Sequence, residues 1–211
     1  MSAPTSDPFH ESLLQGMHTA AQPLAILRAK FYPELVERMN EEELRELAST
    51  TTAQVERLCT LFANLQQLVG AGTAHPKVEN TEVQSLLEYV IEGMDLWFQD
   101  SGMQLKLLTE GALPPVSIDP QRTRQALSSI LLIAHSVSTS GDHLEMTASE
   151  VPDGVQVTVC NQNSAPKSLS GESNLGLAVA ETYVRSQGGD FSLELQPFAV
   201  TVRLPAALLQ N

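Results

Sequence analysis

The sequence predicts an α+β protein in which a helical hairpin, paired with a second copy into a dimeric four-helix bundle, precedes an α/β sandwich. Apolar residues recur every three or four positions along two long stretches before residue 70, which is typical of packed helices. After residue 80, short segments rich in β-branched residues alternate with further helical patterns. We therefore expect a hairpin at 8–70, a linker at 71–80 and a second domain at 81–207.

The composition supports a globular protein and restricts its partners. Of the 211 residues, 42% are hydrophobic, which is enough for a core. The 12 Lys and Arg residues against 25 Asp and Glu residues give a net charge of −13. Nucleic acids and anionic membranes repel such a surface, so neither is expected as a partner. A protein with a basic rim is expected instead.

Cysteine usage and the first residues predict a cytoplasmic protein. Cys59 and Cys160 stand in apolar surroundings without a C-x-x-C pair, so neither a disulfide framework nor a metal site is expected. No window reaches the roughly 18 consecutive apolar residues of a membrane span, and the first residues lack an apolar signal core.

The first helix is expected to run from Pro8 to Phe31, and Pro33 marks its end. Apolar residues on one side of it recur by three and four and form a seam. This first seam consists of Leu14, Met17, Ala21, Leu24 and Phe31.

One histidine stands beside a proline inside this helix. His18 and Gln22 are four residues apart and share a solvent-facing side. Pro23 removes the amide that would bond the carbonyl of Thr19, so we expect a bend just beyond His18 that gives a docking protein access to the imidazole. The alternative is an ordinary surface histidine next to an incidental kink.

The second helix is expected to begin at the N-cap Asn40, with residues 41–43 acidic and suited to the positive end of the helix dipole. Gly70 and Gly72 are expected to end it. Its seam consists of Leu44, Ala48, Thr51, Val55, Leu58, Phe62, Leu65 and Val69. A hairpin cannot bury two such seams alone, so we expect a homodimer. The alternative is a hairpin that packs on the rest of its own chain.

The second domain should contain three helices and a mixed sheet, which together form the α/β sandwich. The helices are expected at 82–100, at 120–138 after the capping residue Asp119, and at 175–186. The strands are expected at 103–108, 116–118, 145–148, 155–160, 191–195 and 200–204. His135 lies on the apolar part of its helix, so it is interpreted as a core histidine and not as a ligand.

The segment HTAAQPL, residues 18–24, resembles the H box of histidine kinases, H-E-x-x-[TNQ]-P-L. The resemblance implies that His18 accepts a phosphoryl group, that Gln22 is the polar residue four positions on, and that Pro23 makes the structural kink. Thr19 replaces the acidic residue that the family uses as a base for the attack on ATP. Autophosphorylation is therefore not expected, whereas phosphate transfer between proteins remains compatible with the motif.

The segment DPQRTRQALSSILLIAHSVS, residues 119–138, resembles the N box of the kinase ATP-binding domain. Scaffold residues of that motif are kept at Asp119, Arg122, Gln125, Leu127, Leu131, Ala134 and Ser138. Ser129 and Ile133 replace its two asparagines, the second of which binds magnesium in the family. Because a hard cation requires oxygen ligands, an isoleucine cannot replace that asparagine.

Two further segments resemble the glycine-rich G1 and G2 boxes. Asn161 replaces the aspartate that contacts adenine in the family, and Asn163 replaces a glycine. Glu172 and Asn174 replace the glycines that begin the G2 box, and a carboxylate there would repel a triphosphate. The segment 166–171 is also shorter than the usual ATP lid. These losses affect separate parts of one site, so we expect a kinase-shaped chain that binds neither nucleotide nor other cofactor.

The combination of an H-box hairpin with a degenerate ATPase-like domain is similar to the dimeric histidine phosphotransferases. The resemblance implies a phosphorelay protein that passes phosphate between response-regulator receiver domains through His18. Gln22 would then be able to position water for receiver dephosphorylation. Two alternatives stay open: a non-catalytic pseudokinase scaffold that regulates a response regulator or kinase, and a divergent active histidine kinase.

Overall fold

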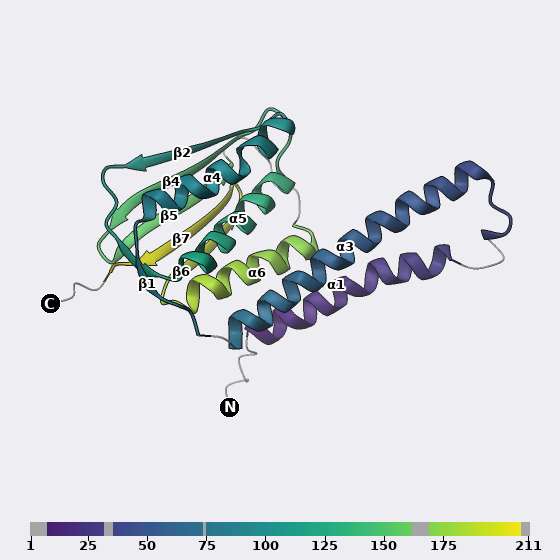
Figure 1. Cartoon of the computed structure of the whole chain (residues 1–211), viewed down its shortest axis with the longest axis horizontal. Coiled ribbons are helices and arrows are strands. Elements are labelled where there is room, and N and C mark those ends of the chain that lie inside the picture. The colour runs from purple at the N-terminus through teal and green to yellow at the C-terminus, as the bar shows by residue number, and fades with distance from the viewer. Residues whose placement is uncertain (1–7, 32–35, 74, 162–168, 208–211) are drawn as a thin grey trace.

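Two long helices, α1 (Pro8–Lys30) and α3 (Glu41–Thr73), form the hairpin. The computed structural model describes residues 8–31, 36–73, 75–161 and 169–207, so Pro33 and Asn163 lie outside the described residues. Where α1 begins and α3 ends, the hairpin packs against α6, whereas its far half projects away from the rest of the chain (Figure 1).

The second part of the chain folds as the predicted sandwich. Its helices are α4 (Val83–Asp100), α5 (Pro120–Val137) and α6 (Gly171–Arg185). Its strands are β1 (Glu79–Thr81), β2 (Gln104–Glu110), β3 (Val116–Ile118), β4 (His143–Val151), β5 (Gly154–Asn161), β6 (Asp190–Leu195) and β7 (Phe198–Pro205). The main sheet has the order β2-β4-β5-β7-β6, with β2 parallel to β4 and the other pairs antiparallel, and the three helices cover one face (Figure 1).

Two helix starts follow the sequence prediction at the level of single hydrogen bonds. The amide of Glu43 donates to Oδ1 of Asn40 at 3.0 Å, and the amide of Asn40 donates to a carboxylate oxygen of Glu43 at 2.8 Å. This reciprocal pair is a capping box. At α5, the carboxylate of Asp119 accepts the amide of Arg122 at 3.1 Å, as an N-cap should.

The region between hairpin and sandwich differs from the prediction. The helix α3 does not end at Gly70 but continues to Thr73. A glycine inside a helix costs only about 1 kcal/mol, so Gly70 alone does not end the helix. Residues 79–81, expected as the end of the linker and the first residue of the second domain, form β1, which pairs antiparallel with β3. A three-residue strand has no periodicity to detect, and its partner lies 37 positions further on, at Val116–Ile118.

The two predicted seams are largely exposed in the single chain. The buried residues of the hairpin instead lie on a neighbouring side and include Ala20, Pro23, Leu47, Leu61 and Leu68. The exposed seam residues are Leu14, Met17, Ala21, Leu24, Phe31, Leu44, Ala48, Val55, Phe62 and Val69. The homodimer expected from these seams stays a prediction, and the single chain shows only that most of their residues are exposed.

None of the described helices is both long enough and apolar enough to cross a membrane. In the same described part of the chain, no cluster of three His, Cys, Asp or Glu side chains is arranged to hold a metal ion.

His135 is half-buried and not the core residue that was expected, because it packs in an aromatic cluster at the C-terminal ends of α4 and α5, next to the 40% exposed Trp97. Its ring stacks on that of Trp97 with centroids 3.6 Å apart, and Phe98 meets it edge-on at 5.1 Å. Nε2 of His135 lies 2.8 Å from Oγ of Ser101. Burial lowers the pKa of His135 below its ordinary value of 6.5.

This cluster predicts a pH-dependent stability. The lowered pKa means that the unfolded chain binds a proton more readily, so the contribution of His135 is fully present above pH 6.5 and is lost as the pH falls through the folded pKa. We expect denaturant unfolding, followed through the single tryptophan, to show a falling midpoint below pH 6.5. His135→Asn should reduce this dependence, and an unchanged pH profile in that variant would contradict the prediction.

Candidate functional site

His18 lies near the middle of α1 with its side chain exposed to solvent. Gln22, one turn further along, is also exposed, so the predicted solvent-facing pair is present. Pro23 is buried, and α1 continues through it as a single helix. The hairpin therefore presents one imidazole and one amide side by side to an incoming molecule.

The turn of α1 that carries His18 touches the sandwich domain through the next residue. A Cβ placed on Gly171, the first residue of α6, would lie 2.5 Å from Oγ1 of Thr19. One turn earlier, a Cβ on Gly16 would lie 2.6 Å from Leu65 and 3.2 Å from Leu175. Two glycines thus allow α1, α3 and α6 to approach closely, and the N-terminal end of α6 flanks the helix that carries His18.

At the position where the family resemblance places a magnesium ligand, this chain has the apolar side chain of Ile133. Ile133 is only 7% exposed, and its Cδ1 lies 3.0 Å from where a Cβ on Gly176 would stand. Gly176 belongs to the G2-like segment, so the glycine that the motif retains accommodates an isoleucine side chain. With no oxygen ligand at Ile133 and a packed contact in its place, the residues present do not fit the cation.

Ser129 and Glu172 border a cavity of about 250 Å³ between α3, α5 and α6. The cavity is also lined by Thr60, Asn64, Leu132, Ile133, Ser136, Ser173 and Gly176. The structure therefore brings three of the predicted degenerate positions together, at Ser129, Ile133 and Glu172. The hairpin forms the third wall of this cavity, because Thr60 and Asn64 belong to α3.

Asn161, at the adenine position of the resemblance, is fully buried and points its amide into the protein. Its Nδ2 donates to Oγ of Ser138 at 2.6 Å and to Oδ2 of Asp142 at 3.1 Å. Asp142 also accepts the amide of Thr139 at 2.9 Å. The donors of the Asn161 amide are therefore used inside the fold and not presented to a purine.

Glu172, at a glycine position of the G2 box, forms an ion pair with Arg57 of α3. The two side chains are 28% and 32% exposed, which places the pair between hairpin and sandwich. Glu172 also lies in the first turn of α6, where the helix dipole favours an anion. Where a kinase would bring a phosphate, this chain has a carboxylate of its own that an arginine already neutralises.

Asn174 lies in the same turn of α6 but does not border the cavity. The backbone amide of Asn174 donates to the carbonyl of Ser170 at 3.0 Å, and Oγ of Ser170 accepts the backbone amide of Ser173 at 3.0 Å. The start of α6 is therefore capped by the chain itself. This capping uses amides that a helix N-terminus otherwise offers to an anion.

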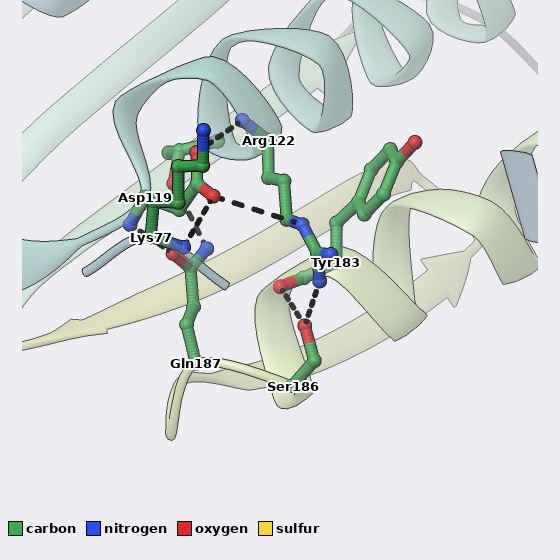
Figure 2. A network of polar contacts seen from close by, with 7 residues as sticks. Lys77, Asp119, Arg122, Tyr183, Ser186 and Gln187 are labelled. Carbon is green, nitrogen blue, oxygen red and sulfur yellow. Dashed lines mark hydrogen bonds and ion pairs between the residues drawn. The ribbon is translucent and has the colours of Figure 1, made fainter. Parts of the chain in front are cut away.

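A second connection fixes the linker to the sandwich (Figure 2). The carboxylate of Asp119 accepts the amide of Lys77 at 2.8 Å. Gln187, just after α6, accepts the amide of Asp119 at 2.6 Å and donates to Oγ1 of Thr123 at 2.9 Å. Asp119 and Gln187 are each 7% exposed. The linker, the start of α5 and the end of α6 are thus joined in one buried polar network.

Sequence reasoning missed the contacts that join the two parts of the chain. Arg57 is the only Lys or Arg of α3 after Arg45, and this isolated charge could have been noticed in the sequence. Its partner Glu172 could not have been found in this way, because it lies 115 positions away. Gly171 and Gly16 carried no signal, because nothing in a single sequence says what approaches a glycine.

Solved structures with the same arrangement are histidine kinases. The histidine kinase AdeS of Acinetobacter baumannii superposes with a TM-score of 0.69 at 18% identity, covering 90% of this chain and 98% of that one. The histidine kinase ThkA, in complex with response regulator protein TrrA, superposes with a TM-score of 0.71 at 14% identity, covering 92% and 61%. The chain therefore has a histidine kinase-like fold.

A histidine kinase is also similar to this chain in sequence. The chain is 25% identical to the sensor histidine kinase ZraS of Escherichia coli O157:H7 over 92% of its own length. It is homologous to this kinase and spans 45% of that protein's length. The chain matches no protein-family model.

Proposed function

We propose that the protein is a phosphorelay intermediate that passes phosphate between receiver domains through His18 without binding ATP. The observation that carries the proposal is the exposed His18 beside a nucleotide position that the protein itself occupies. A histidine open to partners is compatible with transfer from another protein, whereas Ile133 offers no oxygen to a magnesium ion and the carboxylate of Glu172 would repel a triphosphate.

The chemistry requires little from the rest of the chain. A ring nitrogen of neutral His18 attacks the phosphorus of an aspartyl phosphate on the donor receiver, the phosphorus–oxygen bond to the aspartate breaks, and the aspartate leaves as a carboxylate. The other ring nitrogen then loses its proton to water. In the second half, an aspartate carboxylate of the acceptor receiver attacks the phosphorus of the phosphohistidine, the phosphorus–nitrogen bond breaks, and a proton taken up from water restores the neutral imidazole. An acyl phosphate is a reactive donor, so the threonine at position 19 does not prevent this transfer.

Partnership with receivers has a structural parallel. The ThkA structure that resembles this chain holds a response regulator. The acidic character of this chain, with a net charge of −13, would complement a receiver with a basic rim. The decisive experiment is incubation of the purified chain with a panel of phosphorylated receivers, followed by detection of acid-labile, base-stable label on the chain. Absence of transfer from every receiver would refute the proposal.

The second candidate function is a pseudokinase scaffold, favoured by the hydrophobic filling of the magnesium position at Ile133 and Gly176. A scaffold would bind a receiver or a kinase without becoming labelled. The same receiver panel separates the two functions, because binding without label would support the scaffold. Under either function, Gln22 is exposed next to His18, where its amide would be able to orient water against a bound acyl phosphate.

We expect calorimetry with ATP and magnesium to detect no saturable binding. Three positions that would hold different parts of the nucleotide are closed, by packing at Ile133, by internal hydrogen bonds at Asn161 and by an ion pair at Glu172. A dissociation constant near ~1 μM would correspond to about −8 kcal/mol, too much for a residual contact. Such binding would favour a divergent active kinase instead.

A further inference from the structure

The helix α6 is attached at both of its ends to elements outside the sandwich core. At its N-terminal end, Glu172 is paired with Arg57 of α3, and Gly171 lies against Thr19 of α1. Just beyond its C-terminal end, Gln187 belongs to the network that holds the linker through Asp119. Figure 1 shows α6 between the hairpin and the other two helices. The contacts at its N-terminal end hold α6 to the hairpin, and those at its C-terminal end hold it to the linker and to α5.

Two contacts join the start of α6 to the hairpin: the close approach of Gly171 to Thr19, and the ion pair between Arg57 and Glu172. Thr19 is β-branched and has a stiff side chain, so it cannot easily yield to a larger residue at position 171. The Arg57–Glu172 pair is about two-thirds buried, so solvent screens it less than a surface pair. Shape therefore sets how closely α6 approaches the His18 turn, and charge keeps it there.

We propose that Arg57 and Glu172 are positioning residues for His18: their ion pair holds the ATPase-like domain against the hairpin, as a fixed wall next to the turn of α1 that carries His18. This inference rests on the proposed phosphotransfer function and assigns the degenerate domain a role in it. A carboxylate has taken the place of the nucleotide phosphate, so the closed arrangement requires no ligand. A receiver then always meets the same surface, composed of the exposed side of α1 and the immobile start of α6.

The physical consequence concerns geometry at the reacting atoms. Phosphoryl transfer needs the attacking nitrogen in line with the leaving oxygen, and a displacement of about 1 Å can cost up to about a hundredfold in rate. A domain free to move beside His18 would disturb both the orientation of α1 and the seating of the receiver. A fixed domain removes both sources of error.

Two variants break the attachment by different means. Arg57→Gln removes the ion pair and keeps the length of the side chain. Gly171→Ala keeps the charges and places a methyl group 2.5 Å from Oγ1 of Thr19. Their matched controls are Arg45→Gln, which breaks the exposed Arg45–Glu41 pair of the same helix, and Gly93→Ala, which adds a methyl group in open space on α4.

The first measurement follows the attachment itself and requires no phosphate. Spin labels are placed on exposed positions Glu46 of α3 and Lys106 of β2 after Cys59→Ser and Cys160→Val, and the labelled chain is diluted with unlabelled protein. We expect one narrow distance distribution in the parent protein and in both controls. Arg57→Gln and Gly171→Ala should broaden it, and the exchange Arg57→Glu with Glu172→Arg should narrow it again.

The second measurement is label transfer from a phosphorylated receiver. We expect Arg57→Gln and Gly171→Ala to lower the rate at saturating receiver about tenfold, with a smaller change in the receiver concentration at half-maximal rate. The charge exchange should restore most of the rate, and both controls should match the parent. A narrow distribution in every variant would overturn the attachment, and broadening without a change in rate would overturn the positioning role. If the parent protein accepts no label while the distances behave as expected, the proposed function fails and the attachment stands.

Discussion

His18→Gln is expected to abolish acceptance of label from a phosphorylated receiver. Glutamine is similar in size to histidine and keeps a polar side chain at this exposed position, but its amide nitrogen is not a nucleophile. Without the nucleophile that forms the phosphohistidine, we expect no transfer above background, which is a loss in rate of at least about a hundredfold. The measurement is acid-labile, base-stable label on the chain after incubation with the donor receiver.

A matched control for this experiment exists in the sandwich domain. His143→Gln makes the same chemical change at an exposed position at the start of β4. It should leave label transfer at the level of the parent protein. If His18→Gln still accepted label, another residue would be the acceptor and the assignment of His18 would be wrong.

Gln22→Ala should keep transfer and slow the loss of label to water, if the amide of Gln22 positions that water.

Charged residues on the exposed seam are expected to convert a dimer into monomers. The parent chain should scatter light as a particle of twice its 22.9 kDa. Phe62 and Met17 are 54% and 59% exposed in the single chain, and burial of this remaining surface against a second copy would stabilise the dimer by about 1 to 1.5 kcal/mol for each side chain. Met17→Glu with Phe62→Glu removes this gain and places charges without partners in the interface, twice per dimer.

The structure determines which seam residues are suitable for this test. Leu58 belongs to the predicted seam but packs against the chain's own core, so a charge there would destabilise the monomer itself. Leu96 of α4 is 75% exposed and lies outside the hairpin, so Leu96→Glu is the matched control and should leave the dimer intact. A parent protein that scatters as a monomer would contradict the four-helix bundle.

Local physical chemistry made much of the fold predictable. The amide of Glu43 bonds to Asn40 and that of Arg122 to Asp119, and such caps involve residues three positions apart. The helices and strands of the sandwich follow periodicities that a window of ten residues contains. The loss of magnesium ligation at Ile133 also follows from one residue type, because no arrangement of the chain gives an isoleucine an oxygen to donate.

The sequence by itself therefore determined the helix starts capped by Asn40 and Asp119, the mixed sheet, the exposed His18–Gln22 pair and the missing oxygen ligand at Ile133, whereas α6 begins at Gly171, four residues before the expected start. Only the tertiary structure decided that β1 pairs with β3, that Asn161 turns inward to Asp142, and that Arg57 holds Glu172. It also decided that α6 covers one side of the hairpin and leaves the predicted seam exposed. The physical reason is range: caps and periodicity act between neighbours in the chain, whereas these contacts depend on surfaces that meet only after the chain has folded.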